Sequence, residues 1–306
     1  MICMDEMSSW PLVSVAIITY NQLNFLKECI SSVVAQDYPN IEIVVADDGS
    51  TDGTPAFLLA CKNQGARPFV LRLSPTNHGI TANCNAAHFA CSGKYTAWIG
   101  GDDMMLPTKI SEQVQFLESH PEHALCHHRL EIFDNATGKI LLKKMRGTIP
   151  RTGDIRTVVR HGPINGGSST MVRTSCAPLS GYDLRVPIAS DWLYWVDTLS
   201  SGKQIGYIDK VLGRHRRHDN NVTKFRESVA RIEIIQDGLV SCILIVSKYP
   251  RLANLALYRC AHLLLEIRHL ENSRYYADFL HASLAVQVTA KAIVGSFLNA
   301  LFGYRR

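Results

Sequence analysis

The chain has 306 residues, of which 46% are hydrophobic and 19% are charged, and it contains no long low-complexity tract. These values exclude a disordered chain and predict a sizeable core, in one large domain or in one domain with an extension. The net charge of +5 suits a phosphorylated ligand or an anionic membrane surface, and it is too small to indicate nucleic acid as a partner.

Nine cysteines are scattered along the chain without CxxC spacing. An odd, unpatterned set predicts free thiols in a reducing compartment, so we expect a cytoplasmic protein. The first ten residues contain acids and no apolar run, so they do not resemble a signal peptide. Residues 283–306 are the most apolar stretch, but Lys291 interrupts them, and we expect a buried or membrane-surface helix in preference to a span.

The first 120 residues alternate strand and helix patterns. Mainly apolar runs predict strands over residues 12–18, 41–46, 69–73 and 95–99, and the first of them is typical of a strand that is covered on both faces. Between them, helical spacing of apolar residues or a helix-start signal predicts helices around Leu26, Ile30, Val33 and Val34, from Thr54, and over 80–91. Strands joined by single helices predict parallel βαβ units in a doubly wound sheet.

The pattern changes after residue 120. Strands are predicted over 124–134, 168–174 and 205–214, with a helix near 190–200, and the sequence is helical from about 226. We therefore expect an α/β catalytic or binding domain over 1–225 and a helical C-terminal extension over 226–306. Within the domain, the nucleotide-binding half would span 12–120 and the acceptor half 121–225.

Polar residues follow three of the predicted strands. They lie at the carboxyl ends of these strands, which is where parallel sheets bind ligands. They are Thr19-Tyr20-Asn21, Asp47-Asp48 and Gly100-Gly101-Asp102-Asp103. The first acidic pair could accept hydrogen bonds from a base or sugar, and the second could bind a divalent cation together with substrate phosphates. Asp-Asp-Gly is also ordinary turn chemistry, but two such pairs at the ends of apolar strands favour a binding site.

Residues 13–54, with the motif VVADDGSTDGT, resemble the N-terminal signature of the family 2 glycosyltransferases, and residues 77–110 resemble its continuation through the metal motif. The resemblance extends more weakly to residue 223. It implies an A-type glycosyltransferase fold, which is Rossmann-like, with a mostly parallel sheet and helices on both faces. It also implies a nucleotide-sugar donor, Mn²⁺ or Mg²⁺, and inversion at the anomeric carbon.

The resemblance also implies site residues. Asp48 would contact the base and Asp47 would lie close by, while Asp102 and Asp103 would be metal and diphosphate carboxylates. The full set of implied donor contacts is Thr19, Tyr20, Asn21, Asp47, Asp48, Asn85, Gly101, Asp102 and Gly167. Two residues depart from the family pattern: Gly100 stands where the fullest form has an aspartate, and Cys84 where many members have an arginine.

Three later segments carry weaker matches. Residues 165–174 are similar to the glycine loop between donor and acceptor. Residues 189–199 are similar to the segment with the catalytic base, where Asp191 is retained and Ser190 replaces a glutamate. Residues 215–223 are similar to the segment with a late metal-binding histidine, here His218.

Asp191 has two interpretations. The residues alone favour a helix cap and a general base equally, and the resemblance favours the base. Trp192, beside it, is a candidate acceptor contact, although tryptophans at this spacing are more often core residues. Asp52 is expected to organise its turn.

The predicted function is the inverting, metal-dependent transfer of a sugar from a nucleotide-sugar donor to a glycan or lipid-linked acceptor in surface polysaccharide biosynthesis. One alternative is a non-catalytic sugar-nucleotide or glycan-binding module on the same fold, and a third reading is a nucleotidyltransferase. The C-terminal region could pack on the catalytic domain, form a homo-oligomer with a second subunit, or rest on the inner face of a membrane.

Overall fold

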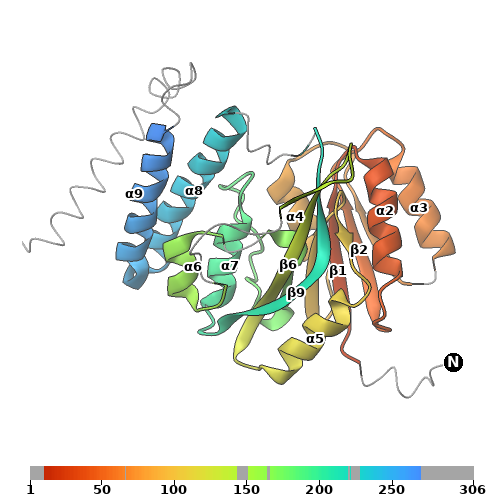
Figure 1. Ribbon diagram of the computed structural model, residues 1–306, viewed down its shortest axis with the longest axis horizontal. Coiled ribbons are helices and arrows are strands. Elements are labelled where there is room, and N and C mark those ends of the chain that lie inside the picture. The colour runs from red at the N-terminus through yellow and green to blue at the C-terminus, as the bar shows by residue number, and fades with distance from the viewer. Residues whose placement is uncertain are drawn as a thin grey trace, which may run out of the picture.

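The structure is a computed structural model that describes residues 10–65, 67–142, 151–163, 166–219, 221 and 228–269. The described strands form one sheet with helices on both faces (Figure 1). In chain order they are β1 (Val13–Thr19), β2 (Ile41–Asp47), β3 (Phe69–Leu73), β4 (Tyr95–Gly100), β5 (Met104–Met105), β6 (His123–Asp134), β7 (Ile140–Leu142), β8 (Thr170–Arg173) and β9 (Gln204–Arg217).

The strand order in the sheet is β3-β2-β1-β4-β8-β6-β9-β5, and β7 pairs with β6. The first four strands are parallel, which confirms the predicted βαβ units. The second half is mixed, because β8 runs antiparallel to β4 and β6 while β9 runs parallel to β6. The short strands predicted over 205–214 are one longer strand, β9, which pairs with β6 along its length through several register shifts.

Two sets of helices cover the two faces of the sheet. One face carries α2 (Leu23–Val34), α3 (Thr54–Gln64) and α5 (Lys109–Ser119). The other carries α4 (Ile80–His88), α6 (Ile155–His161) and α7 (Asp191–Leu199), and α8 (Ser228–Lys248) and α9 (Ala253–His269) pack on α6 and α7 as an outer pair. Short 3₁₀ turns are η1 (Gly167–Ser169), η2 (Thr174–Cys176) and η3 (Pro250–Leu252).

Alternation along the central strands explains the two cores. In β1, Val13, Val15 and Ile17 pack against α2, α3 and α5, while Ala16 packs on the opposite side with α4. Both sets of side chains are buried, which is why the run is apolar apart from Ser14 and the terminal Thr19. In α2 the buried stripe contains Cys29 in place of the predicted Val34, which ends the helix and is 38% exposed.

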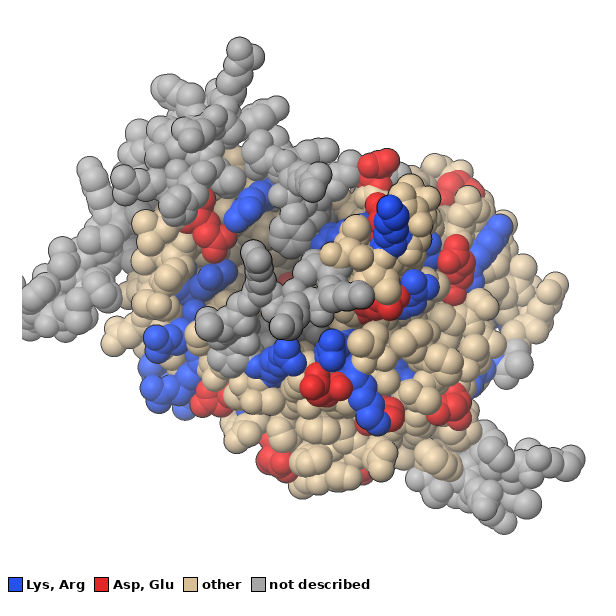
Figure 2. Space-filling model, viewed as in Figure 1, with Lys and Arg blue, Asp and Glu red and all other residues tan. Residues whose placement is uncertain are grey.

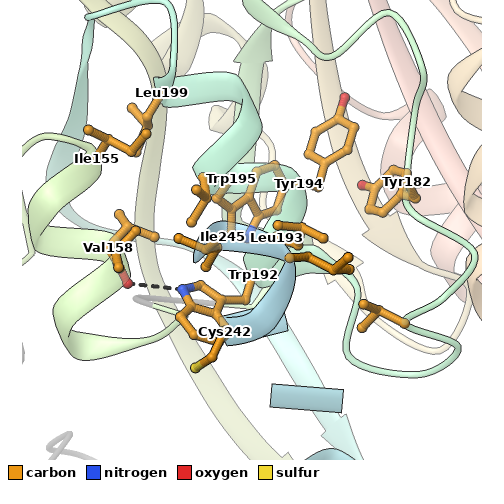
Figure 3. Close-up of a cluster of buried hydrophobic side chains, with 14 of the residues drawn as sticks. Ile155, Val158, Tyr182, Trp192, Leu193, Tyr194, Trp195, Leu199, Cys242 and Ile245 are labelled. Carbon is orange, nitrogen blue, oxygen red and sulfur yellow. Dashed lines mark hydrogen bonds between the residues drawn. The ribbon is translucent and has the colours of Figure 1, made fainter. Parts of the chain in front are cut away.

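The helices α8 and α9 belong to the same core as α6 and α7. Trp192 and Trp195 of α7 lie against Cys242 and Ile245 of α8 (Figure 3). Among the described residues, no helix combines the length and apolar character needed to cross a membrane. The predicted boundary at 225/226 and the apolar stretch 283–306 lie outside the described residues.

Removing side-chain volume from Ile245, which is fully buried, tests whether α8 folds with the sheet. We expect Ile245→Ala to lower the free energy of unfolding by about 2–4 kcal/mol in a single cooperative transition, because it opens a cavity in the shared core. Urea melts monitored by tryptophan fluorescence and by circular dichroism measure it. Ile243→Ala on the same helix, where the side chain is 45% exposed, should change stability by less than about 0.5 kcal/mol. Separate transitions for the sheet and α8 would contradict the shared core.

Candidate active site

The ends of β1 and β2 are held together by one side chain of α4. The amide nitrogen of Asn83 donates to the carbonyl oxygens of Thr19 at 3.2 Å and Ala46 at 3.1 Å. The backbone N–H of Asp48 also donates to the Thr19 carbonyl, at 3.1 Å. Asn83 is buried, so these bonds are shielded from water. These bonds therefore fix the distance between the carboxyl ends of β1 and β2, beside which the candidate site lies.

Asp47 and Asn21 hold the loops that follow these strands. The Asp47 carboxylate is fully buried and accepts from the backbone N–H and the hydroxyl of Ser50. Ser50 Oγ accepts from the N–H of Asn21 at 2.7 Å, and Asn21 Oδ1 accepts from the N–H of Thr51 at 2.8 Å. Asn21 has a φ of 50°, a left-handed conformation that asparagine tolerates. Burial raises the pKa of Asp47 above its ordinary value.

Asp48 fixes a third loop against the first two. Its carboxylate is buried and accepts from the N–H groups of His78 at 2.9 Å and Gly79 at 2.8 Å. Gly49 has a φ of 77°, and a Cβ there would lie 2.6 Å from the carbonyl carbon of Thr76. Only glycine permits this approach. Asp52 accepts from the N–H of Thr54 at 3.2 Å and from its hydroxyl at 2.7 Å, which confirms that it organises its turn, and it also accepts from the N–H of Leu23 at 2.8 Å.

Thr19 and Tyr20 line the rim between the two acidic pairs. Tyr20 is 46% exposed, while Thr19 is buried and its Oγ1 has no hydrogen-bond partner among the described residues. A Cβ at Gly101 would lie 3.0 Å from this oxygen, so the Gly101 backbone runs directly past it. A buried polar atom without a protein partner is a candidate contact for a ligand or a water molecule.

The members of the second acidic pair face different partners. Asp103 is 2% exposed, accepts from the N–H of Arg216 at 2.9 Å and lies 3.0 Å from His215 Nδ1. Asp102 Oδ2 lies 3.0 Å from His218 Nε2 and accepts from the amide of Asn221 at 3.0 Å. Asp103 thus joins β9 to the end of β4, whereas Asp102 and His218 point toward each other.

Histidine partners offset the effect of burial in this pair. Burial opposes the ionisation of Asp102, but the hydrogen bond from His218 and the charge of His215 leave its pKa below the ordinary value. Burial likewise opposes protonation of His215, yet its hydrogen bond to Asp103 leaves the pKa of His215 raised. Asp102 is therefore held in the charged form that binds cations.

Arg216 holds the backbone of Asp102 in place. Its guanidinium is buried and donates to the Asp102 carbonyl oxygen at 2.9 Å, and further bonds reach Glu28 and Asn135. The rings of Phe25 and Phe133 lie 4.8 Å and 5.0 Å from it. The ring of Phe25 also lies 4.5 Å from that of His218. The sequence pattern gave no sign that Arg216 is used in this way.

The chemistry of Asp102 and His218 fits a divalent cation. A carboxylate oxygen and an imidazole nitrogen are both ligands of Mn²⁺, and Mg²⁺ accepts the carboxylate. Among the described residues no group of three or more His, Cys, Asp or Glu side chains is arranged to hold a metal. A set of two protein ligands suits a cation that completes its coordination with diphosphate and water.

Gly100 lies beside the carboxylate of Asp102. A Cβ at Gly100 would lie 2.7 Å from Asp102 Oδ1, so an aspartate here would require Asp102 to move. Cys84, the second departure from the family pattern, is a buried core residue. Burial raises the pKa of its thiol to about 12, so it is neutral at physiological pH.

The glycine loop is fixed to β4 and α5. Ser168 Oγ accepts from the N–H of Gly100 at 3.1 Å, and the Ser168 carbonyl accepts from Lys109 Nζ at 3.0 Å. Lys109 is fully buried, and burial lowers its pKa to about 7. No atom lies within 4 Å of the position of a Cβ at Gly167. Sequence reasoning missed Lys109, although a lysine within the apolar stripe of a helix is a signal that could have found it.

Asp191 is the first residue of α7 and is only partly exposed. Its Oδ1 accepts from the N–H of Trp192 at 2.8 Å, and burial raises its pKa to about 6. The neighbouring Ser190 is hydrogen-bonded to Thr81 of α4 at 2.8 Å. Because Asn83 on the same helix holds the strand ends, α4 connects the Asp191 segment to the rim. The helix begins at Asp191 itself, and its N-cap residue is Ser190, which makes no side-chain cap bond, so Asp191 is not the N-cap. The raised pKa suits a general base.

Two predicted contacts are used elsewhere in the structure. Trp192 is 3% exposed and its indole N–H donates to the Val158 carbonyl at 2.9 Å, so it is a core residue and not an acceptor contact (Figure 3). The Asn85 amide donates to the Tyr182 carbonyl at 2.9 Å and accepts from its N–H at 2.7 Å. Both amide atoms therefore hold the loop at Tyr182, because Asn85 lies on the face of α4 directed toward that loop.

The family model for glycosyl transferase family 2 matches residues 14–177. The chain belongs to glycosyl transferase family 2. One related protein is an uncharacterised protein from Mycobacterium tuberculosis (strain ATCC 25618 / H37Rv), which is 35% identical to this chain over 123 residues. The match covers 39% of this chain and 35% of that protein, so the chain aligns with about a third of its relative's length.

Two solved structures share the A-type glycosyltransferase fold with this family 2 chain. S. aureus TarS 1–349 in complex with UDP-GlcNAc has a TM-score of 0.64 at 19% identity, over 94% of this chain and 81% of that one. Mannosyltransferase PcManGT from Pyrobaculum calidifontis in complex with GDP-Man and Mn²⁺ has a TM-score of 0.58 at 17% identity, over 98% and 89%. The expected fold is confirmed.

The raised pKa of Asp191 has a consequence for stability. A carboxyl whose pKa is higher in the folded state than in the unfolded state lowers stability as pH rises from about 4 to about 6. Asp191→Asn can keep the bond from the Trp192 N–H without the charge, so we expect this variant to be about 1–2 kcal/mol more stable than wild type at pH 8. The difference should shrink toward zero near pH 4. Urea melts at both pH values measure it, and equal stability at pH 8 would contradict the shift.

Proposed function

We propose that the chain transfers a sugar from a nucleoside-diphosphate sugar to a hydroxyl group of a glycan or lipid-linked acceptor, with inversion of the anomeric carbon. The observation that carries this proposal is the facing pair of Asp102 and His218 beside the rim of Thr19 and Asp48, with Asp191 tied to the same rim by α4. Family membership already establishes a glycosyltransferase domain.

The donor is proposed to lie along the strand ends. Tyr20 and Asp48 would contact the nucleoside, and the unpartnered Thr19 Oγ1 beside Gly101 would contact ribose or phosphate. The ligands named with the two similar structures, UDP-GlcNAc and GDP-Man, support a nucleoside-diphosphate sugar as the class.

Asp102 and His218 would hold Mn²⁺ or Mg²⁺, and the Mn²⁺ named with PcManGT supports this choice. The cation, when bound, would neutralise the charge that develops on the departing diphosphate. Asp103 would support the pair by joining the segment after β4 to β9, since its carboxylate accepts from the Arg216 N–H and faces His215.

Asp191 is proposed to act as the general base. As the acceptor oxygen bonds to the anomeric carbon and the bond to the diphosphate oxygen breaks, the acceptor proton would pass to the Asp191 carboxylate. A single displacement from the face opposite the diphosphate inverts the anomeric carbon. A pKa of about 6 keeps the base largely ionised at neutral pH while leaving it basic enough to accept a proton.

For the acceptor we propose a lipid-linked glycan of surface polysaccharide synthesis, reached at the cytoplasmic face of a membrane. Lysine and arginine side chains gather at the lower left of the face in Figure 2, near the helical end of the molecule. Together with the net charge of +5, they would favour an anionic lipid surface.

The metal site is tested by stabilisation on ligand binding. We expect UDP or GDP to raise the melting temperature of the wild-type chain only when Mn²⁺ is present, since ligand binding to the folded state stabilises it by mass action. Asp102→Asn and His218→Ala should both lose this Mn²⁺-dependent shift. Asp209→Asn, which removes an exposed carboxylate of β9, should keep it. A full shift in Asp102→Asn would rule out the assigned ligand.

The role of Asp191 is tested by turnover. We expect Asp191→Asn to lower kcat about a thousandfold while UDP and GDP still bind, because the variant keeps the fold and lacks the proton acceptor. In the wild type, kcat/KM should rise with pH to a plateau with an apparent pKa near 6, since only the ionised base is active. Release of nucleoside diphosphate from a panel of UDP- and GDP-sugars measures both.

Other results would favour the alternatives. A chain that binds donor and never turns over, with any acceptor or with water, would be a sugar-nucleotide-binding module. Release of pyrophosphate would indicate a nucleotidyltransferase.

A further inference from the structure

The segment that leads into Asp191 is held from the α4 side by a buried hydroxyl. Thr81 Oγ1 donates to the carbonyl oxygen of Val186 at 2.6 Å and lies 2.8 Å from Ser190 Oγ. Thr81 and Ser190 are each 2% exposed. This contact fixes both ends of the segment that immediately precedes α7.

The same segment is held from the opposite side by Asp237 of α8. One carboxylate oxygen, Oδ2, accepts from the N–H groups of Ile188 and Ala189, both at 2.7 Å. Asp237 is 5% exposed, so these are buried, charge-assisted hydrogen bonds to two consecutive backbone groups. Ala189 is two residues before Asp191. The carboxylate therefore restrains the backbone that sets the position of Asp191.

Apolar contacts reinforce this link. Trp192, next to Asp191, lies against Cys242 and Ile245, which are one to two turns beyond Asp237 on α8 (Figure 3). The backbone before Asp191 and the side chain after it thus both rest on α8.

We propose that Asp237 is a positioning residue for Asp191, and that α8 therefore belongs to the framework of the reaction site. This inference rests on the proposed role of Asp191 as general base. A misplacement of about 1 Å at a reacting group can lower a rate about a hundredfold, so the restraint matters for turnover as well as for folding. Asp237 acts through Asp191 and is assigned no contact with substrate.

The chain offers a matched control at the far end of α7. Asp197 also links α7 to the end of α8, since its carboxylate accepts from Lys248 Nζ and the Tyr249 hydroxyl, both at 2.9 Å. Asp197 lies six residues after Asp191, at the other end of the helix. Asp197→Ala removes a buried carboxylate that links α7 to the end of α8 through side-chain donors, without touching the segment that precedes Asp191.

The first measurement is hydrogen exchange of the Ile188 and Ala189 amides. We expect Asp237→Ala to raise their exchange rates at least about tenfold, because both lose their acceptor, while Asp197→Ala leaves them unchanged. Unchanged exchange in Asp237→Ala would overturn the inference whatever the turnover shows. If Asp237→Ala does not fold, Asp237→Asn serves in its place, since its single amide oxygen forms weaker bonds to the same groups.

The second measurement separates positioning from a general loss of structure. We expect Asp237→Ala to lower kcat about 10- to 100-fold with the donor KM within about twofold, and Asp197→Ala to keep kcat within about threefold. In the Asp191→Asn background, Asp237→Ala should change the residual rate less than about threefold, since the group that it positions is already lost. An equal loss in both backgrounds, or an equal loss in Asp197→Ala, would overturn the inference. No turnover in the wild type would instead overturn the proposed function.

Discussion

The two hydrogen bonds from the Asn83 amide set the geometry on which the site depends. Parallel strands leave carbonyl groups at their carboxyl ends, and a buried carbonyl without a donor destabilises the fold by about 1–3 kcal/mol. Asn83 satisfies the carbonyls of Thr19 and Ala46 with one side chain, so β1 and β2 end in register below the rim. Because Thr81 on the same helix contacts Ser190, the spacing of the strand ends is transmitted to the segment that carries Asp191. A single short helix thus relates the proposed donor contacts to the proposed base.

The four acidic residues at the rim differ in burial, and their roles differ accordingly. A buried carboxylate is stable only with hydrogen-bond donors around it, and Asp47, Asp48 and Asp103 each accept from backbone N–H groups of a neighbouring turn, loop or strand. Asp102 is the most open of the four, with a side chain that is 19% exposed, and it faces His218. Three carboxylates therefore fix loops, and their rigidity leaves Asp102 at a defined place where a cation and a diphosphate could meet it.

The helical C-terminal region has a structural role that the sheet alone does not supply. Residues of α8 cover the tryptophans of α7, and Asp237 accepts from the backbone that precedes Asp191. Burial raises the pKa of Asp191, so its charged form is disfavoured there, and a group proposed as general base must be held rigidly in position to react. The contacts of α8 provide that rigidity on one side of α7, and α4 provides it on the other.

The sequence by itself determined the elements of the first half, the parallel sheet, the two acidic pairs at strand ends and the family. These features are local, since each depends on apolar runs, helical spacing and turn residues within about ten positions. Only the tertiary structure decided what each polar residue does. Asn83 and Asn85 are two positions apart, yet one holds the strand ends and the other a distant loop. Trp192 points into the core because α8 covers that face. The bonds between His218 and Asp102, and between Asp237 and Ile188, join residues 116 and 49 positions apart, and packing of the whole fold is what brings them together.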